Sequence, residues 1–307
     1  MREIRILTGR IIKLYLKNPL SLLFSFVYML LFIVLISLFL GDYMADGMTE
    51  AYAGVAGMDF THIRWLVDST SMAGVLMINC ILVPLNVLMI MVQDQSENRL
   101  DSFLVSQVSR SRLVLGYWLA PFLVGIVLNV ICLFISEGFL VMNGGAWLSI
   151  QDNFKMAGLI VMNSFSATSI LFIAAMLTKT VSLYSTFTGI ISALIGFITG
   201  AFLPIGVFPE NIQKLFALLP AHHGATLMRE VMTKAPLAEV FADVTDQNVK
   251  GAFMTAEEIA DIYMAENGIT YMFGKMKVES PIMAAVVLGS GILFMGISIY
   301  LMKRYKK

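Results

Sequence analysis

The sequence predicts an all-α integral membrane protein with six transmembrane helices. It also predicts an N-terminal amphipathic helix, a short cytoplasmic helix between spans two and three, and short extracellular re-entrant helices between spans five and six. Of the 307 residues, 58 % are hydrophobic and only 14 % are charged, whereas about a quarter of a soluble domain is charged. The apolar residues gather in long runs, and nearly all the charges lie between them. Together these observations favour a chain whose main solvent is lipid.

Six apolar runs are long enough to cross a bilayer as helices, because about 20 residues traverse a hydrocarbon core of about 30 Å. These runs are residues 20–40, 72–92, 113–142, 157–177, 181–203 and 282–302. Lipid offers the backbone no hydrogen-bond partners, so these spans are expected to be helices, and no alternating strand pattern indicates a barrel. The first run is longer than the apolar region of a signal peptide, and no cleavage-like motif follows it, so we expect it to remain as a span.

The distribution of Lys and Arg predicts the orientation of the chain. Basic residues cluster before the first span, after the last span and in the second connection, and Lys179 lies in the fourth. The first connection is acidic with Arg64 as its only basic residue, and the third has only Lys155. The positive-inside rule then predicts a multi-pass protein of the plasma membrane with both termini cytoplasmic. Residues 204–281 are too long a connection to weigh in that rule, but the order of six spans puts them outside.

Residues 1–18 have the pattern of a basic amphipathic helix. Ile4, Leu7, Ile11, Leu14 and Tyr15 recur at helical spacing, and the basic residues lie largely elsewhere around the helix. Such a helix is suited to lie in the inner headgroup layer, or it serves as a simple positive-inside anchor.

The second connection predicts another short helix. Ser96 can cap it, and Leu100, Phe103 and Leu104 share an apolar face. A short helix with such a face just inside the membrane either docks in a groove of a cytosolic protein or lies on the lipid surface.

Two stretches resemble the type 2 ABC exporter permeases, of the G-type-like multidrug and antibiotic efflux kind. The stretch "QDQSENRLDSFLVSQVSRSRLVLGYWLAP" is similar to the cytoplasmic loop of that family, where an acidic segment precedes a Leu-rich helix and a "VSR" turn leads into the third span. The stretch "FLPIGVFPENIQKLFALLPAHHGATLMREVM", residues 202–232, is similar to the family's outward segment after span five. The resemblance covers nearly the whole chain except about residues 234–280.

The resemblance implies that residues 1–307 form a single exporter transmembrane domain that moves its substrate out of the cell. Such a domain pairs with a second permease copy or a paralogue and with two copies of a separate ABC ATPase. The second connection would be its coupling helix, with Arg99 and Arg110 as polar contacts to the ATPase. The residues to which this role transfers are Glu97, Arg99, Leu100, Phe103, Leu104 and Arg110.

No cofactor and no catalytic activity are expected in this chain. ATP and Mg²⁺ would be bound by the partner ATPase, because the sequence contains no Gly-x4-Gly-Lys-Ser/Thr loop to cradle phosphates. Nothing in the sequence indicates a nucleic-acid partner.

For the substrate path, the resemblance points to spans two and five. The candidate cavity residues there are Asn79, Asn86, Thr186, Thr188, Ser192 and Phe197. A cavity of this composition would accept amphipathic molecules, such as drugs, antimicrobial peptides or lipid-like compounds, by shape and burial more than by fixed charges. The amides within spans, which include Asn129 and Asn163, either hydrogen-bond between helices or line a cavity.

Residues 234–280 depart from the family pattern. Thr255 and Glu258 form a capping-box motif, which predicts a short helix through about Ala265 that ends at Asn267-Gly268. This insertion is interpreted as a cap over the exit, a receptor contact or an ordinary loop.

Two other classes of function fit the sequence less well. A secondary transporter or ion-efflux protein without an ATPase would need paired carboxylates within its spans, and Glu137 is the only charge in the six runs. Glu137 either contacts substrate or protons, or reaches water at the outer interface. A membrane enzyme would need catalytic side chains clustered at one depth, and the sequence contains no such cluster. His222 and His223 are adjacent and poorly placed to share a metal.

Overall fold

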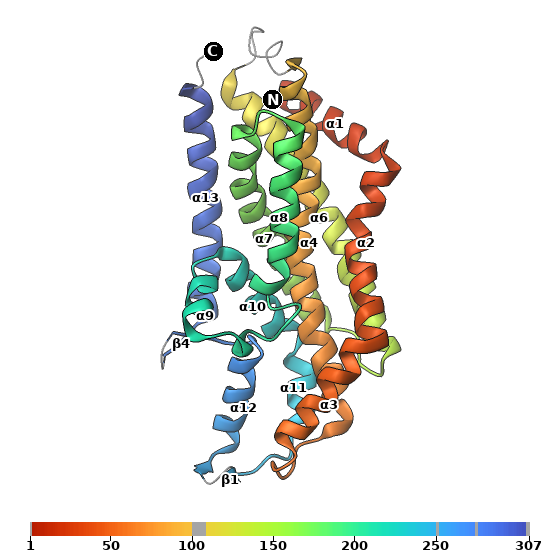
Figure 1. Ribbon diagram of the computed structural model, residues 1–307, viewed down its shortest axis with the longest axis vertical. Helices are drawn as coiled ribbons and strands as arrows, with labels where there is room; N and C mark the ends of the chain where they lie inside the picture. The colour runs from red at the N-terminus through yellow and green to blue at the C-terminus, as the bar shows by residue number, and fades with distance from the viewer. Residues whose placement is uncertain (1, 100–108, 250–251, 274–275, 305–307) are drawn as a thin grey trace.

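The computed structural model describes residues 2–99, 109–249, 252–273 and 276–304, which form an elongated bundle of roughly parallel helices (Figure 1). Six helical segments are long and apolar enough to cross a membrane: Pro19–Ala51, Phe60–Ser96, Arg110–Met142, Ile150–Leu177, Val181–Ile198 and Ser280–Met302. The predicted all-α membrane fold is confirmed.

The helices in chain order are α1 (Arg2–Leu16), α2 (Pro19–Leu35), α3 (Gly41–Tyr52), α4 (Ile63–Ser96), α6 (Arg110–Met142), α7 (Ile150–Leu177), α8 (Val181–Ile198), α9 (Glu210–Ala217), α10 (Pro220–Met232), α11 (Lys234–Val240), α12 (Ala256–Glu266) and α13 (Ser280–Arg304). Two small antiparallel hairpins join β1 (Gln247–Val249) to β2 (Ala252–Met254) and β3 (Tyr271–Phe273) to β4 (Met276–Val278). Asn248 pairs with Phe253, and Met272 pairs with Lys277.

The first span is longer than its apolar run. A turn of π-helix, Ile36–Leu40, joins α2 directly to α3, so the helix continues past residue 40 to Tyr52. The 33 residues of Pro19–Ala51 measure about 50 Å at about 1.5 Å per residue, well beyond the hydrocarbon core. After Leu40 the chain carries acidic side chains, which favour water over lipid. Ala, Met and Glu in α3 are nevertheless good helix formers, so the helix continues.

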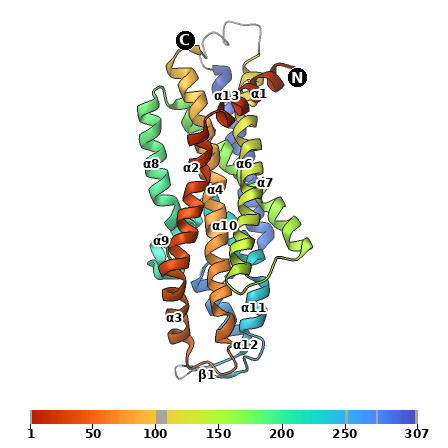
Figure 2. The same cartoon turned by 90° about the vertical axis from the view of Figure 1, so that its right-hand side faces the viewer.

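Helix α4 lies at the centre of the bundle, where both views show it between the other spans (Figures 1 and 2). It packs against α2, α6, α7, α8 and α10. In its most apolar window 78 % of the residues are buried, compared with 22 % in the first and last spans and 17 % in α8. The first span, α8 and α13 therefore turn most of their apolar surface outward.

The two ends of the bundle differ in composition. Both chain ends and α1 lie at one end, which we call the terminal end, whereas α3, α11, α12 and β1 lie at the other, the distal end (Figure 1). A second apolar cluster at the distal end joins α4 to the insertion through Leu66, Val240, Ile259 and Tyr263. The insertion is thus folded onto the bundle and is not a loose loop.

The predicted capping box of the insertion is confirmed. The Thr255 hydroxyl accepts a hydrogen bond from the Glu258 amide at 3.2 Å, and the Thr255 amide donates to Glu258 Oε2 at 2.8 Å. Helix α12 ends before Gly268, whose φ of 65° is in the left-handed region that favours glycine.

Candidate functional site

The predicted coupling segment connects α4 to α6, and the ends of these two helices that flank it lie at the terminal end. Leu100, Phe103 and Leu104 fall outside the described residues, whereas Glu97, Arg99 and Arg110 flank the segment. Ser96 does not begin a new helix, because it is the last residue of α4 and its hydroxyl donates to the Gln93 carbonyl at 3.0 Å. Asn98, at a φ of 56°, turns the chain away after α4 ends.

A buried carboxylate anchors the terminal end. Asp94, with a side chain only 2 % exposed, receives two hydrogen bonds from Arg10, at 2.6 and 2.9 Å. The Tyr117 hydroxyl donates to the same carboxylate at 2.7 Å. Arg10, Asp94 and Tyr117, which we call the Asp94 clamp, join α1, α4 and α6 beside the coupling segment. Bidentate Arg–carboxylate pairs of this kind are among the stronger polar contacts in proteins.

The charged residues at the edges of the coupling segment are partly engaged. Arg99 pairs with Glu97 and lies 3.6 Å from Asp94, and both Arg99 and Glu97 are half-exposed. Arg110 Nη1 donates to the Met302 carbonyl at 3.5 Å, which brings the start of α6 to the end of α13. The half-exposed pair remains accessible to a partner from the solvent side.

The amphipathic helix α1 does not simply lie on lipid. Leu7, Ile11 and Tyr15 are buried, and α1 packs against α6. Gly116 of α6 leaves room for Leu7, because a Cβ at Gly116 would overlap the Leu7 side chain. The apolar stripe predicted from the sequence is therefore largely a protein contact, whereas Leu14 remains exposed.

The candidate cavity residues lie on α4 and α8. Asn79 is buried and donates to Cys132 Sγ in α6 at 3.6 Å, and Asn86 is half-buried. The hydroxyls of Thr186, Thr188 and Ser192 donate to carbonyls one turn earlier in α8. Phe197 stacks edge-to-face on Phe202, with 5.2 Å between ring centroids.

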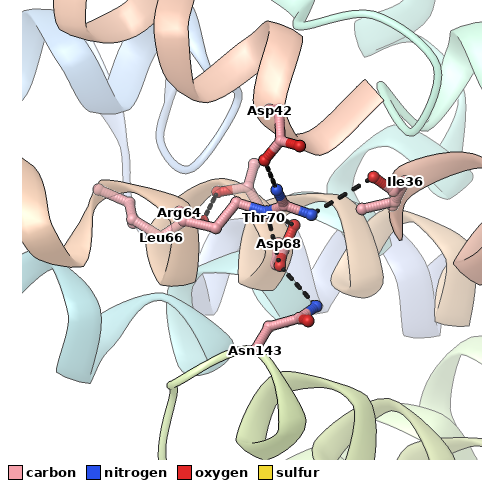
Figure 3. A network of polar contacts seen from close by, with 7 residues as sticks. All are labelled: Ile36, Asp42, Arg64, Leu66, Asp68, Thr70 and Asn143. Atoms are coloured by element: carbon pink, nitrogen blue, oxygen red, sulfur yellow. Dashed lines mark hydrogen bonds and ion pairs between the residues drawn. The ribbon is translucent and has the colours of Figure 1, made fainter. Parts of the chain in front are cut away.

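At the distal end, Arg64 is the centre of a network that joins the first three spans (Figure 3). Its guanidinium pairs with Asp42 and, at 3.0 Å, with the fully buried Asp68. Asn143 Nδ2 donates to Asp68 Oδ2 at 3.1 Å, and Arg64 Nη2 donates to the Ile36 carbonyl at 3.4 Å. Polar groups far apart in sequence thus hold the long first helix against α4.

Arg229, in the "LMRE" stretch, is fully buried and is held by backbone carbonyls. Its Nε donates to Thr70 at 3.2 Å, its Nη1 to Gly268 at 3.5 Å and its Nη2 to Thr199. Thr199 caps the C-terminus of α8, where carbonyl groups attract a cation. Arg229 therefore ties α10 to α4, α8 and the insertion.

Glu137 does not reach water, contrary to one of the two interpretations of its position. Glu137 is only 1 % exposed, and Asn153 Nδ2 donates to its Oε2 at 3.4 Å.

The adjacent His222 and His223 lie edge-on to Tyr271, with centroid distances of 5.3 and 5.5 Å. Within the ranges described above, no group of three or more His, Cys, Asp or Glu side chains is placed to hold a metal.

Sequence reasoning did not identify the clamp, the Arg64 network or the role of Arg229. The available signal was that Asp68 and Asp94 lie just outside the predicted second span, at the two ends of one helix. Their separation of 26 residues corresponds to about 39 Å of helix, which places each carboxylate near a membrane interface.

The fold and these two polar ends define a multi-pass α-helical membrane protein. Residues 2–233 match the family model described as ABC-2 type transporter. The chain therefore belongs to the ABC-2 type transporter family and is a membrane domain of an ABC transporter, a non-catalytic transmembrane part. No curated protein matches the chain.

Proposed function

We propose that this chain is the permease subunit of an exporter that a separate ABC ATPase drives. Two ATPase copies would bind ATP and Mg²⁺ and dock on the segment around residues 97–110 of two permease chains, either identical or paralogous. The cargo would be an amphipathic drug, an antimicrobial peptide or a lipid-like compound. The proposal assigns the terminal end to the cytoplasm and the distal end to the outside of the plasma membrane.

The observation that carries this proposal is the Asp94 clamp. A docking segment transmits motion only if it is attached firmly to the helices that must move. The clamp joins α4 to α6 across the two ends of the segment and fixes α1 to both. A displacement of the segment would therefore be passed to the central helix α4 as a rigid-body movement, one of the established types of conformational coupling.

A second permease chain is supported by the outward surfaces of the bundle. Phe24, Leu31 and Phe39 of the first span and Leu183 and Ile190 of α8 are all more than half exposed. Lipid or the second permease would cover these faces. A substrate path between two permeases would then run along the outward face of α8, where the candidate residues Thr186 and Phe197 are exposed.

The direct test is isolation of the tagged full chain in mild detergent, identification of the bound subunits and reconstitution into sealed vesicles. We expect an ATPase with a phosphate-binding loop to co-purify, and we expect transport of an amphipathic dye only with ATP and that subunit. Transport by the isolated chain without any nucleotide-hydrolysing partner would overturn the proposal and favour a secondary transporter.

A further inference from the structure

A pocket of about 160 Å³ lies between α7 and α8, under the first turn of α10. It exists because α8 packs against α4, while α7 packs against α4, α6, α10 and α13. Its lining includes Met77 of α4, Asn163 and Ala167 of α7, Ile191 and Ile195 of α8, and Pro220 of α10. None of the lining side chains is charged.

Asn163 is the unusual residue in this lining. Asn163 is fully buried, yet neither its Nδ2 nor its Oδ1 has a hydrogen-bond partner among the described residues. Buried amides are normally hydrogen-bonded, because leaving the donor and acceptor unpaired in an apolar environment is unfavourable. The Asn163 amide can therefore hydrogen-bond to a group bound in the pocket that it lines.

Packing against α10 keeps the Asn163 amide in place. A Cβ on Gly224 would overlap Oδ1 of Asn163 and approach the Met77 sulfur, so the absence of a side chain at Gly224 accommodates the amide. The site is thus formed by a glycine on one helix and an amide on another. It differs from the proposed path along the outward face of α8, because none of the six candidate cavity residues lines it.

The depth of the pocket limits what can enter it. Asn163 is 13 residues from the first residue of α7 and 14 from the last, which is about 20 Å of helix on either side. It therefore lies near the middle of the hydrocarbon core, where ligands arrive from the lipid phase. An apolar pocket at this depth is expected to exclude water and bind apolar groups.

We propose that this pocket binds an apolar chain or ring that carries one neutral hydrogen-bonding group, such as an ester or an amide. Asn163 Nδ2 donates to the carbonyl of that group, while Oδ1 is held against Gly224. Both a bilayer lipid and a membrane-dissolved amphipathic compound have this chemistry. The site is a property of the single chain and does not depend on the proposed ATPase partner.

The test uses the purified full chain in lipid nanodiscs and three photoreactive diazirine probes: a phosphatidylcholine labelled on its acyl chain, an uncharged N-alkyl amide, and a plain alkane. Labelled positions are mapped by mass spectrometry. We expect saturable labelling of 163–171 and 191–195 by the amide, and excess unlabelled amide should suppress it. Labelling of the same segments by the phosphatidylcholine identifies a bilayer lipid as an occupant, whereas labelling by the amide alone identifies a dissolved compound.

Two variants and a matched control separate this site from surface lipid. Ala167→Phe fills the pocket and should abolish the saturable labelling, whereas Ala193→Phe makes the same change at an exposed position of α8 and should leave it intact. Asn163→Leu should reduce amide labelling about three- to tenfold, the effect of one lost neutral hydrogen bond, with alkane labelling unchanged. Labelling that is non-saturable in the unmodified protein, or that persists in Ala167→Phe, would overturn the proposal.

Discussion

Gly41 lies against the guanidinium of Arg64, so closely that a Cβ on Gly41 would overlap it. The glycine follows the π-helical turn Ile36–Leu40, and Arg64 uses the resulting space to reach Asp42, Asp68 and the Ile36 carbonyl. π-Helical turns inside α-helices are often found at functional positions. Because Gly41 has no side chain, Arg64 of α4 has room to form its ion pairs.

Replacing this glycine is expected to destabilise the protein. Gly41→Ala would displace Arg64 from the buried Asp68, and overpacking of this kind costs about 1–3 kcal/mol. Thermal unfolding in detergent measures the effect. The control is Gly47→Ala in the same helix, where a Cβ meets nothing within 4 Å, and this change should be neutral or stabilising by up to about 1 kcal/mol. Equal destabilisation by both variants would contradict the role of the space at Gly41.

The Asp94 clamp predicts a strong effect of removing its charge. Asp94→Asn should lower the free energy of unfolding by about 1–3 kcal/mol, because Arg10 loses the carboxylate that faces it. A double variant with Arg10→Ala should be less destabilised than the sum of the single changes, since both remove one interaction. Glu3→Gln breaks only the half-exposed pair with Arg112 and should change stability by less than about 0.5 kcal/mol. Additive effects at Asp94 and Arg10 would show that the pair is not coupled.

The docking proposal predicts that Phe103→Asp weakens ATPase binding while membrane insertion continues. A charge on the predicted apolar face would oppose burial in a groove of the partner. Co-purification of the ATPase and its stimulated turnover are the measurements. The control is Ser102→Asp, about 200° around the predicted helix from Leu100 and so on the side opposite its apolar face. Full binding and turnover in Phe103→Asp would remove the coupling role from this segment.

The topology can be tested with single cysteines. A membrane-impermeant thiol reagent applied to intact cells should label Glu257→Cys in α12 but not Arg99→Cys, because the proposed orientation puts the distal end outside. After permeabilisation both positions should react. The buried Cys80 and Cys132 are expected to remain unlabelled and provide the background. Labelling of Arg99→Cys alone in intact cells would reverse the orientation.

Glu137 separates ATP-driven transport from proton-coupled transport. If an ATPase supplies the energy, Glu137→Gln should retain transport, since Gln can still accept a hydrogen bond from Asn153 without a buried charge. Transport of an amphipathic dye into vesicles, with ATP and separately with an imposed pH gradient, provides the measurement. Loss of transport with ATPase turnover intact would instead favour a proton pathway through Glu137.

The spans were predictable because their signal is local. About 20 consecutive apolar residues suffice to cross the hydrocarbon core whatever the rest of the chain does, and the six predicted runs each lie within or overlap one of the six long helices. The same holds for α12, whose capping box lies within four consecutive residues. The ends of the helices were less predictable, because α3 and the first turns of α4 remain helical beyond the apolar runs.

The sequence by itself determined the membrane class, the six spans and the family, because hydropathy and short motifs are read along the chain. Only the tertiary structure decided that Arg10 meets Asp94, 84 positions away, that Asn79 faces α6 and that Asn163 lines a pocket without a hydrogen-bond partner. Each of these depends on the rotation of a helix about its axis and on which neighbour it packs against. That rotation is set by the summed packing of many side chains, such as the close fit at Gly41 and Gly224, and not by the residue's own neighbours in sequence.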